Sequence, residues 1–204
     1  MKVSRVQRLA AIAMTLLAIL VGAVSLRYLA PQPPAAPPNV MGNPFVVLLP
    51  AHAALSAIAL LIGPFQILAG PERGRGWHRL RGRIYVICCL LSAPLGLVLA
   101  FGATTGPIAT AGFGLLSIVW FAVTALGYRA AVERRFDAHR RWMMRSYALT
   151  FGAVTLRIYL AFAIATHLDF DTAYRAISFL SWIPNLIFAE LLLQRSGSGP
   201  LKVF

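Results

Sequence analysis

The sequence contains six predominantly apolar runs, each long enough to cross a lipid bilayer. They cover approximately residues 9–30, 45–70, 84–101, 108–128, 142–166 and 173–193. A transmembrane helix needs about 20 apolar residues, because within hydrocarbon every backbone amide must be bonded inside its own segment. Hydrophobic residues make up 59% of the chain and charged residues 12%, unlike a soluble protein. The pattern predicts an all-α, polytopic membrane bundle of about six transmembrane helices.

The basic residues are distributed unequally between the two sides that these runs define. Short loops rich in arginine and lysine remain in the cytoplasm. Sixteen of the 19 basic residues lie on one side: Lys2, Arg5, Arg8, Arg73, Arg75, Arg79, Arg81, Arg83, Arg129, Arg134, Arg135, Arg140, Arg141, Arg145, Arg195 and Lys202. Only Arg27 and Arg175 lie on the opposite side, and Arg157 falls within the fifth run. We therefore expect both the N and C termini in the cytoplasm.

The apolar pattern also divides the chain into segments. Residues 1–30 are predicted to form an N-terminal anchor helix; a cleavable signal peptide is the alternative, but the apolar core exceeds the usual ~7–15 residues. Prolines within residues 31–44 indicate an extended extracytoplasmic linker. Residues 45–194 are expected to form a five-helix membrane bundle, and residues 195–204, which include serine and glycine, a disordered tail.

A net charge of +13 does not indicate a nucleic-acid partner in this chain. Nucleic-acid binding uses basic residues on a water-exposed folded surface, whereas these cluster between apolar runs. We expect them to contact anionic lipid head groups, and a membrane-protein partner or a homo-oligomer would also suit the chain. Cys88 and Cys89 are interpreted as packing residues, because adjacent cysteines rarely form a disulfide and no third soft ligand lies nearby.

Two polar residues within the apolar runs are candidates for a binding site. Arg157 near mid-bilayer costs about 2.5–3.5 kcal/mol on insertion scales, so it requires compensation. Helix carbonyls, Thr155 or Tyr159 could satisfy it, or it could bind an anionic cofactor group or substrate. His52 lies at a similar depth, and Gln66 follows it on the same helical face. That face is either a polar binding stripe or a packing seam with hydrogen bonds across it.

Two segments at predicted cytoplasmic helix ends resemble each other, WHRLRGRIY at residues 77–85 and HRRWMMRSY at residues 139–147. Helices two and three could therefore be repeated, in parallel orientation, as helices four and five. One interpretation is that arginines and aromatic residues hold these helix ends at lipid phosphates. The other is that His78 and His139 converge as axial ligands of haem b, or around a quinone, with arginines such as Arg145 on the propionates.

Three further residues carry narrower expectations. Glu190, near the inner end of the sixth helix, is expected to pair with a cytoplasmic arginine. Pro184 in the same helix frees a backbone carbonyl and permits a kink. His167 is expected to be an exposed loop residue rather than a partner of His52.

Several motifs together resemble one family: GPFQ at residues 63–66, HR with GRIY within 78–85, HRRWMMRSYALTF at 139–151 and TLR at 155–157. On these, residues 45–190 resemble the bacterial predicted membrane proteins grouped as domain of unknown function 2306. The resemblance implies a multi-pass protein of the bacterial cytoplasmic (inner) membrane, and it implies no reaction. It places His52, Gln66, His78, His139, Arg145 and Arg157 in family-like segments.

Three functions fit these observations. The first is a haem- or quinone-interacting redox bundle of cytochrome b type, for which the cofactor-binding candidates are the six residues just named and the metal ligands are His78 and His139. The second is a transporter of a small anionic molecule, and the third is an accessory subunit of a membrane complex. Hydrolysis is disfavoured, because the sequence has no paired intramembrane carboxylates, no Gly-x-Ser-x-Gly and no His-Glu-x-x-His motif.

Overall fold

The computed structural model describes residues 5–30, 38–69 and 74–195, and every secondary-structure element in these ranges is helical. The longer helices are α1 (Arg5–Ser25), α3 (Leu49–Ala69), α4 (Arg75–Phe101), α5 (Pro107–Val132), α6 (Phe136–Thr150), α7 (Gly152–Ala165), α8 (Phe170–Leu180) and α9 (Ile183–Arg195). Three short helices, η1 (Leu26–Leu29), α2 (Pro38–Met41) and η2 (Val46–Leu48), lie in the connections. Six spans within the described residues are long and apolar enough to cross a membrane, which confirms the predicted fold class.

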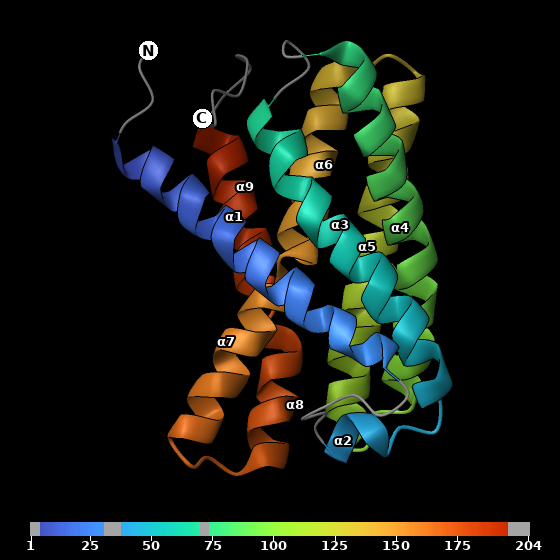
Figure 1. Cartoon of the computed structure of the whole chain (residues 1–204), viewed down its shortest axis with the longest axis vertical. Helices are drawn as coiled ribbons and strands as arrows, with labels where there is room; N and C mark the ends of the chain where they lie inside the picture. The colour runs from blue at the N-terminus through green and yellow to red at the C-terminus, as the bar shows by residue number, and fades with distance from the viewer. Residues whose placement is uncertain (1–4, 31–37, 70–73, 196–204) are drawn as a thin grey trace.

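The helices form a bundle with two distinct ends. Figure 1 shows α3, α4, α5 and α6 as neighbours, with α1 running obliquely across the bundle and ending beside the far half of α3. The end of α3, the start of α4, the α5–α6 turn and the end of α9 lie together at the top of Figure 1. We call this the basic end, because residues 77–83 and 129–145 lie there; the opposite end, with α2 and the α7–α8 loop, is the far end. That the basic end faces the cytoplasm stays a prediction.

The connections differ in part from the predicted segments. An extended linker was expected over residues 31–44, but residues 38–41 form α2, a single helical turn that begins at Pro38. Proline is favoured at the first position of a helix, where its missing N–H would be unpaired in any case. The rest of the proline-rich stretch, 31–37, and the predicted tail, apart from Arg195 at the end of α9, lie outside the described residues.

The fifth and sixth spans are each interrupted near the middle. The fifth passes from α6 to α7 at Phe151, and the sixth passes from α8 to α9. Pro184 lies in the first turn of α9, where it has no N–H with which to continue the helix from α8. The two interruptions adjoin, since a Cβ added at Gly152 would lie 3.2 Å from the Ser181 carbonyl oxygen and 3.4 Å from Trp182 Cβ. At the far end, α7 and α8 form a hairpin of their own (Figure 1).

A buried hydrogen-bond network joins α4, α5 and α6. The Tyr85 hydroxyl lies 2.9 Å from Ser146 Oγ and 2.8 Å from Thr150 Oγ1. Trp120 Nε1 donates to Thr150 Oγ1 at 3.0 Å, and Thr124 Oγ1 lies 2.7 Å from Ser146 Oγ. Such bonds between membrane helices stabilise by roughly 0.6 kcal/mol each on average. Together they fix the relative rotation of the three helices from which much of the far-end cavity is built.

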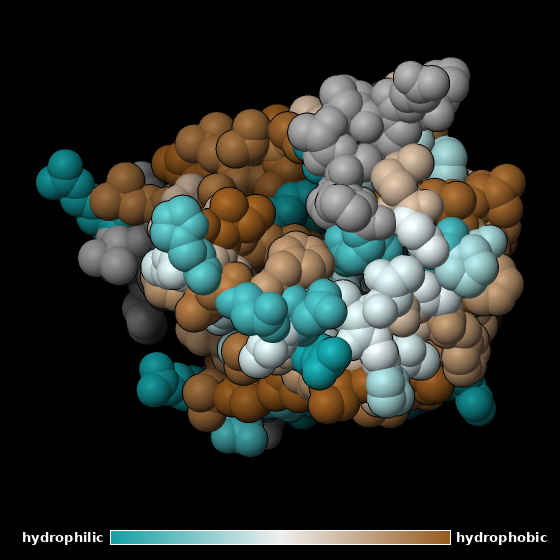
Figure 2. All heavy atoms as spheres, turned by 90° about the horizontal axis from the view of Figure 1, so that it is seen from below, coloured by the Kyte–Doolittle hydropathy of each residue, from teal (hydrophilic) through white to brown (hydrophobic). Residues whose placement is uncertain are grey.

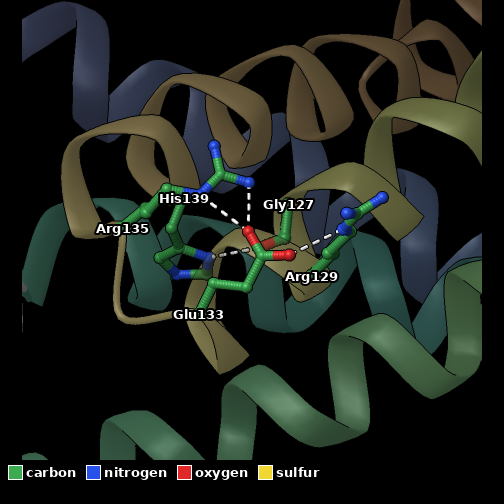
Figure 3. Close-up of polar contacts among 5 residues, drawn as sticks. All are labelled: Gly127, Arg129, Glu133, Arg135 and His139. Atoms are coloured by element: carbon green, nitrogen blue, oxygen red, sulfur yellow. Dashed lines mark hydrogen bonds and ion pairs between the residues drawn. The ribbon is translucent and has the colours of Figure 1, made fainter.

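Charged residues hold the turn between α5 and α6 at the basic end. Figure 3 shows Glu133 between Arg129 and Arg135, whose Nε atoms each donate to it at 2.7 Å. These hydrogen bonds, first that from Arg129, lower the pKa of the Glu133 carboxyl below its usual value. His139, in the first turn of α6, points back toward α5, and its Nδ1–H donates to the Gly127 carbonyl oxygen at 2.8 Å. The turn therefore fixes the orientation of the His139 ring.

Candidate functional site

A cavity of about 270 Å³ opens at the far end, where α1, η1 and α2 meet the far halves of the other helices. Its polar lining residues are Ser25, Tyr28, Asn39, Asn43, His52, Ser56, Thr104, Ser117, Thr150, Arg157, Tyr174 and Ser181. Aspartate, glutamate and lysine are absent from the lining formed by the described part of the chain. Figure 2 shows the far end, with hydrophilic and pale side chains gathered in its middle and hydrophobic ones on its flanks. The cavity therefore has a largely apolar lining in which a set of polar side chains is embedded.

Arg157 is the charged group of this cavity. Its Nη1 donates to the Ala153 carbonyl oxygen one turn earlier at 2.9 Å, and its Nη2 donates to Ser25 Oγ of α1 at 2.7 Å. The Ser25 hydroxyl in turn donates to the Val21 carbonyl oxygen at 2.7 Å, so its lone pair faces the guanidinium. No carboxylate pairs with Arg157 within residues 5–30, 38–69 and 74–195. Two neutral acceptors thus satisfy part of the guanidinium and leave its positive charge uncompensated.

A second guanidinium stands beside the cavity wall. Arg27 lies over the ring of Tyr28, with Cζ 5.1 Å from the ring centroid, and its Nη2 donates to the Tyr28 hydroxyl at 3.2 Å. Its Nε is buried and bonds to nothing in the described chain. The Oδ1 atom of Asn39, on α2, is likewise buried without a partner there. Both atoms are buried beside the cavity without a hydrogen-bond partner in the described chain, which is unusual for buried polar atoms.

His52 lies on α3 and is fixed by α4. Its Nδ1 is 3.0 Å from the Ser92 carbonyl oxygen, and because a carbonyl can only accept, Nδ1 carries the proton. The Ser92 hydroxyl is 3.0 Å from the same nitrogen and 2.7 Å from Ser56 Oγ. A Cβ added at Gly96 would lie 2.9 Å from His52 Cε1, so the absence of a side chain there admits the ring. In the neutral ring, Nε2 is then the nitrogen left to accept a hydrogen bond.

The structure brings together two of the six predicted site residues. His52 and Arg157 line one cavity, in agreement with the similar depths expected for them. The other four predicted residues lie in the parts of their helices near the basic end, and none of them lines this cavity: Gln66, His78, His139 and Arg145. The face of α3 for which a polar binding stripe or a hydrogen-bonded packing seam was predicted is therefore divided between the two ends. Gln66 Nε2 donates to the His78 carbonyl oxygen at 3.1 Å rather than contributing to the His52 site.

Arg145 has a partner of its own at the basic end. Its guanidinium forms a two-point ion pair with the Glu190 carboxylate, through Nε to Oε1 and through Nη2 to Oε2 at 2.9 Å. Its Cζ also lies 4.7 Å from the centroid of the Trp142 ring. The predicted pairing of Glu190 with an arginine is confirmed. Arg145 therefore joins α6 to α9, and a role on a cofactor propionate stays a prediction.

The two proposed metal ligands remain an untested pair. His78 and His139 lie close enough for their charges to interact. The Nδ1 bond of His139 to Gly127 leaves its Nε2 for a further partner. No group of three or more histidine, cysteine or acidic side chains is arranged to hold a metal ion among the residues that the structure describes. The far-end histidine, His167, is an exposed loop residue, as predicted.

Sequence reasoning missed several groups at the cavity. Ser25 and Tyr28 come from α1 and η1, which were expected to act only as an anchor, and Asn39 comes from the predicted linker. Tyr174, on α8, contacts Phe113 of α5 with ring centroids 5.4 Å apart. The sequence did contain an indication of their role. Ser25 and Tyr28 are polar residues near the outer end of the first apolar run, and His52 and Arg157 were predicted to lie toward the same side of the membrane.

The fold and the cavity define a class: a polytopic all-helical membrane protein with an arginine-containing pocket at one end of its bundle. The model of the family described as Predicted membrane protein (DUF2306) matches residues 49–193, and the chain belongs to that family. The resemblance drawn from the motifs is thereby confirmed. No curated protein and no solved structure matches the chain. The matched segment runs from the start of α3 into α9, so Ser25 and Tyr28 come from outside it.

Proposed function

We propose that this protein is a transporter of a small anionic molecule, located in the bacterial inner membrane, and that the anion binds in the far-end cavity. The observation that supports this most directly is Arg157, a guanidinium within a membrane span that has no carboxylate partner among the described residues. Charged residues in spans are costly, and they commonly mark a substrate or ion pathway. A bound anion would supply the missing countercharge.

The interrupted fifth and sixth spans favour transport over simple binding. In many transporters, substrate sites are formed by discontinuous helices, whose broken ends allow one part of the bundle to move against another. Here Arg157 lies on α7 and Tyr174 on α8, the far-end halves of the two interrupted spans, whereas His52 lies on the uninterrupted α3. Movement of the α7–α8 hairpin relative to α3 would therefore change the cavity directly.

Transport can be tested with purified protein in liposomes. Uptake is measured for labelled phosphate, sulfate, chloride and several carboxylates, in wild type and in the variants Arg157→Leu and Arg157→Lys. We expect uptake of at least one anion, a loss of tenfold or more in Arg157→Leu, and an intermediate rate in Arg157→Lys, which keeps the charge but not the planar fork. Arg129→Leu is the control, because that exposed arginine lies at the other end of the bundle.

The variants are first compared by size-exclusion chromatography and thermal melting, so that an unfolded protein is not mistaken for an inactive one. Uptake by Arg157→Leu at the wild-type rate, in a folded protein, would refute the proposal. So would the absence of uptake of every anion by wild-type liposomes that retain their internal volume.

A haem-binding redox function is the second candidate, favoured by one observation at the basic end. The Nδ1–H of His139 bonds to a backbone carbonyl, an arrangement that commonly orients a metal-ligating histidine for coordination through Nε2. Protein purified from cells supplied with haem precursors should then show a Soret band that shifts on reduction. The band should disappear in His139→Ala and in His78→Ala while remaining in His52→Ala; a colourless wild-type protein would exclude this function.

A further inference from the structure

Among the cavity-lining residues that the structure describes, His52 is the side chain that can exchange a proton near neutral pH. The other polar lining residues are serines, threonines, asparagines, tyrosines and Arg157, none of which ordinarily gains or loses a proton in this range. Imidazole does so, and the described lining contains no aspartate, glutamate or lysine. A proton that enters this cavity with a ligand therefore has His52 to bind it.

The hydrogen bonds of His52 leave one ring nitrogen available for a proton. Its Nδ1–H donates to the Ser92 carbonyl oxygen at 3.0 Å, and this donor is present in the neutral and in the protonated ring alike. Protonation at Nε2 therefore breaks no contact with α4. Nε2 has no hydrogen-bond partner in the described chain, and unlike Arg27 Nε and Asn39 Oδ1 it is not among the atoms buried without one. It is therefore accessible, on a side chain that lines the cavity.

The one charge that acts on His52 within the described chain is that of Arg157, across the cavity. Helix α3 has no aspartate, glutamate, lysine or arginine, and the charged residues of α1, α4 and α6 belong to the basic end. Opposite His52, α8 contributes the phenol of Tyr174. From the middle of the bundle to the far end, the elements packed against α3 carry the titratable residues Arg27, Tyr28, Tyr85, Cys88, Cys89 and Tyr147. Phenols and thiols are ordinarily neutral at pH 7, and Arg27 acts on Arg157 rather than on His52.

Arg157 therefore links the binding of an anion to the binding of a proton. In the empty cavity, its guanidinium repels a second positive charge, and such repulsion is strong where little water screens it. This favours the neutral ring of His52. An anion bound to Arg157 offsets the repulsion and attracts a proton to Nε2. The effect is reciprocal, because a proton on His52 strengthens anion binding by the same factor by which the anion strengthens proton binding.

We propose that the anion is carried together with a proton, which binds His52 at Nε2, so that the protein is an anion–proton symporter. The inference rests on the proposed function and names the ion that travels with its substrate. The proton comes from water at the open far end, forms an N–H bond with the Nε2 lone pair, and returns to water when the cavity opens to the other side. Each proton cancels one negative charge, which reduces the electrical work of bringing an anion into a cell whose interior is negative.

The first measurement is the affinity of the purified protein for an anion as a function of pH, by titration calorimetry. The probes are sulfate, chloride and gluconate, which stay ionised between about pH 6 and pH 9. Phosphate, which itself titrates, is a fourth probe and is read only as the difference between wild type and variant. We expect the wild-type affinity to rise about fivefold or more as the pH falls over this range. His52→Asn, whose amide N–H can still donate to the Ser92 carbonyl, should match wild type at about pH 9 and show no rise.

The second measurement is accumulation of the labelled anion in liposomes. The anion is present at equal concentration on both sides, and valinomycin with equal potassium holds the membrane potential at zero. With the outside more acidic by about one pH unit, wild type should accumulate the anion up to about tenfold, whereas a carrier without proton coupling leaves the concentrations equal. His52→Asn should not accumulate it. His52→Gln is a second variant in case the asparagine disturbs folding, and liposomes without protein are the control for leakage.

The outcomes separate this inference from the proposed function. Arg157-dependent binding and uptake that ignore pH in wild type overturn the proton coupling and leave the transporter proposal standing. The same holds if folded His52→Asn and His52→Gln keep the pH dependence, or if they bind no anion at about pH 9, because His52 would then serve the anion itself. If none of the four anions shows binding or uptake that requires Arg157, both proposals are overturned.

Discussion

A tight contact between α3 and α6 gives the sharpest stability prediction. A Cβ added at Gly63 of α3 would lie 2.1 Å from Cε2 and 2.3 Å from Cδ2 of Tyr147, on α6. Carbon atoms pack best at about 3.5–4.0 Å, so Gly63→Ala requires the ring or the helix to move by roughly 1.5 Å. Overpacking of this kind costs about 1–3 kcal/mol. Small residues at such crossings are what allow membrane helices to approach closely.

The cost can be measured as the free energy of unfolding in mixed detergent micelles, titrated with sodium dodecyl sulfate. Gly63→Ala should lose about 1–3 kcal/mol. Gly76→Ala is the matched control, since a Cβ at Gly76 meets nothing within 4 Å, and it should be neutral or slightly stabilising. In a Tyr147→Leu background the loss should shrink by at least about 1 kcal/mol, because the aromatic ring is absent. An equal loss in both backgrounds, or no loss in wild type, would refute the contact.

Two further predictions concern hydrogen bonds. Tyr85→Phe should destabilise the protein by about 1 kcal/mol, because it removes a hydroxyl bonded to Thr150, whereas Tyr147→Phe should have no such cost, because the Tyr147 hydroxyl is buried without a partner in the described chain. Detergent unfolding compares them, and equal losses would contradict the network. At the start of α8, Asp169 accepts from the Thr172 N–H at 2.9 Å, a bond that lowers the pKa of the carboxyl. Its stabilisation is present above the unfolded pKa of about 3.9 and lost as pH falls through the lower folded value, so the gap in melting temperature between wild type and Asp169→Ala should close below about pH 4. Asp169→Asn should keep the hydrogen bond from the Thr172 N–H without that pH dependence. A difference in melting temperature between wild type and Asp169→Ala that stays constant with pH would contradict this role of the carboxylate.

Hydropathy located all six spans but placed some helix starts too late. The fifth apolar run was predicted from residue 142, whereas α6 begins at Phe136; likewise the third was predicted from residue 84, whereas α4 begins at Arg75. The difference has a physical cause, because the apolar signal reports only the part of a helix within hydrocarbon. Both helices continue into the polar interface at the basic end, where arginine side chains can reach water or lipid phosphates.

Counting along the helices grouped two of the polar residues correctly, but it could not give their lateral neighbours. Counting residues from the helix ends placed His52 and Arg157 at one level, and both line the cavity. The same count cannot say which helices stand side by side, because that depends on crossing angles and on close-packing glycines. Gln66 was therefore grouped with His52 along one face of α3, although the His78 carbonyl oxygen to which it donates lies at the opposite end of the bundle.

The first helix shows how far this limitation extends. By hydropathy alone α1 is an anchor, and the family match begins only at residue 49, so neither signal connects it with the site. Yet Ser25 of α1 accepts a hydrogen bond from Arg157 of α7, across 132 positions of sequence. The oblique course of α1 across the bundle brings its last turn to the far half of α3 (Figure 1), where Ser25 lines the cavity. Because Ser25 is an uncharged acceptor, it orients the guanidinium without neutralising its charge, whereas an acidic residue at this position would form an ion pair with Arg157 and remove the feature on which the proposed anion binding depends.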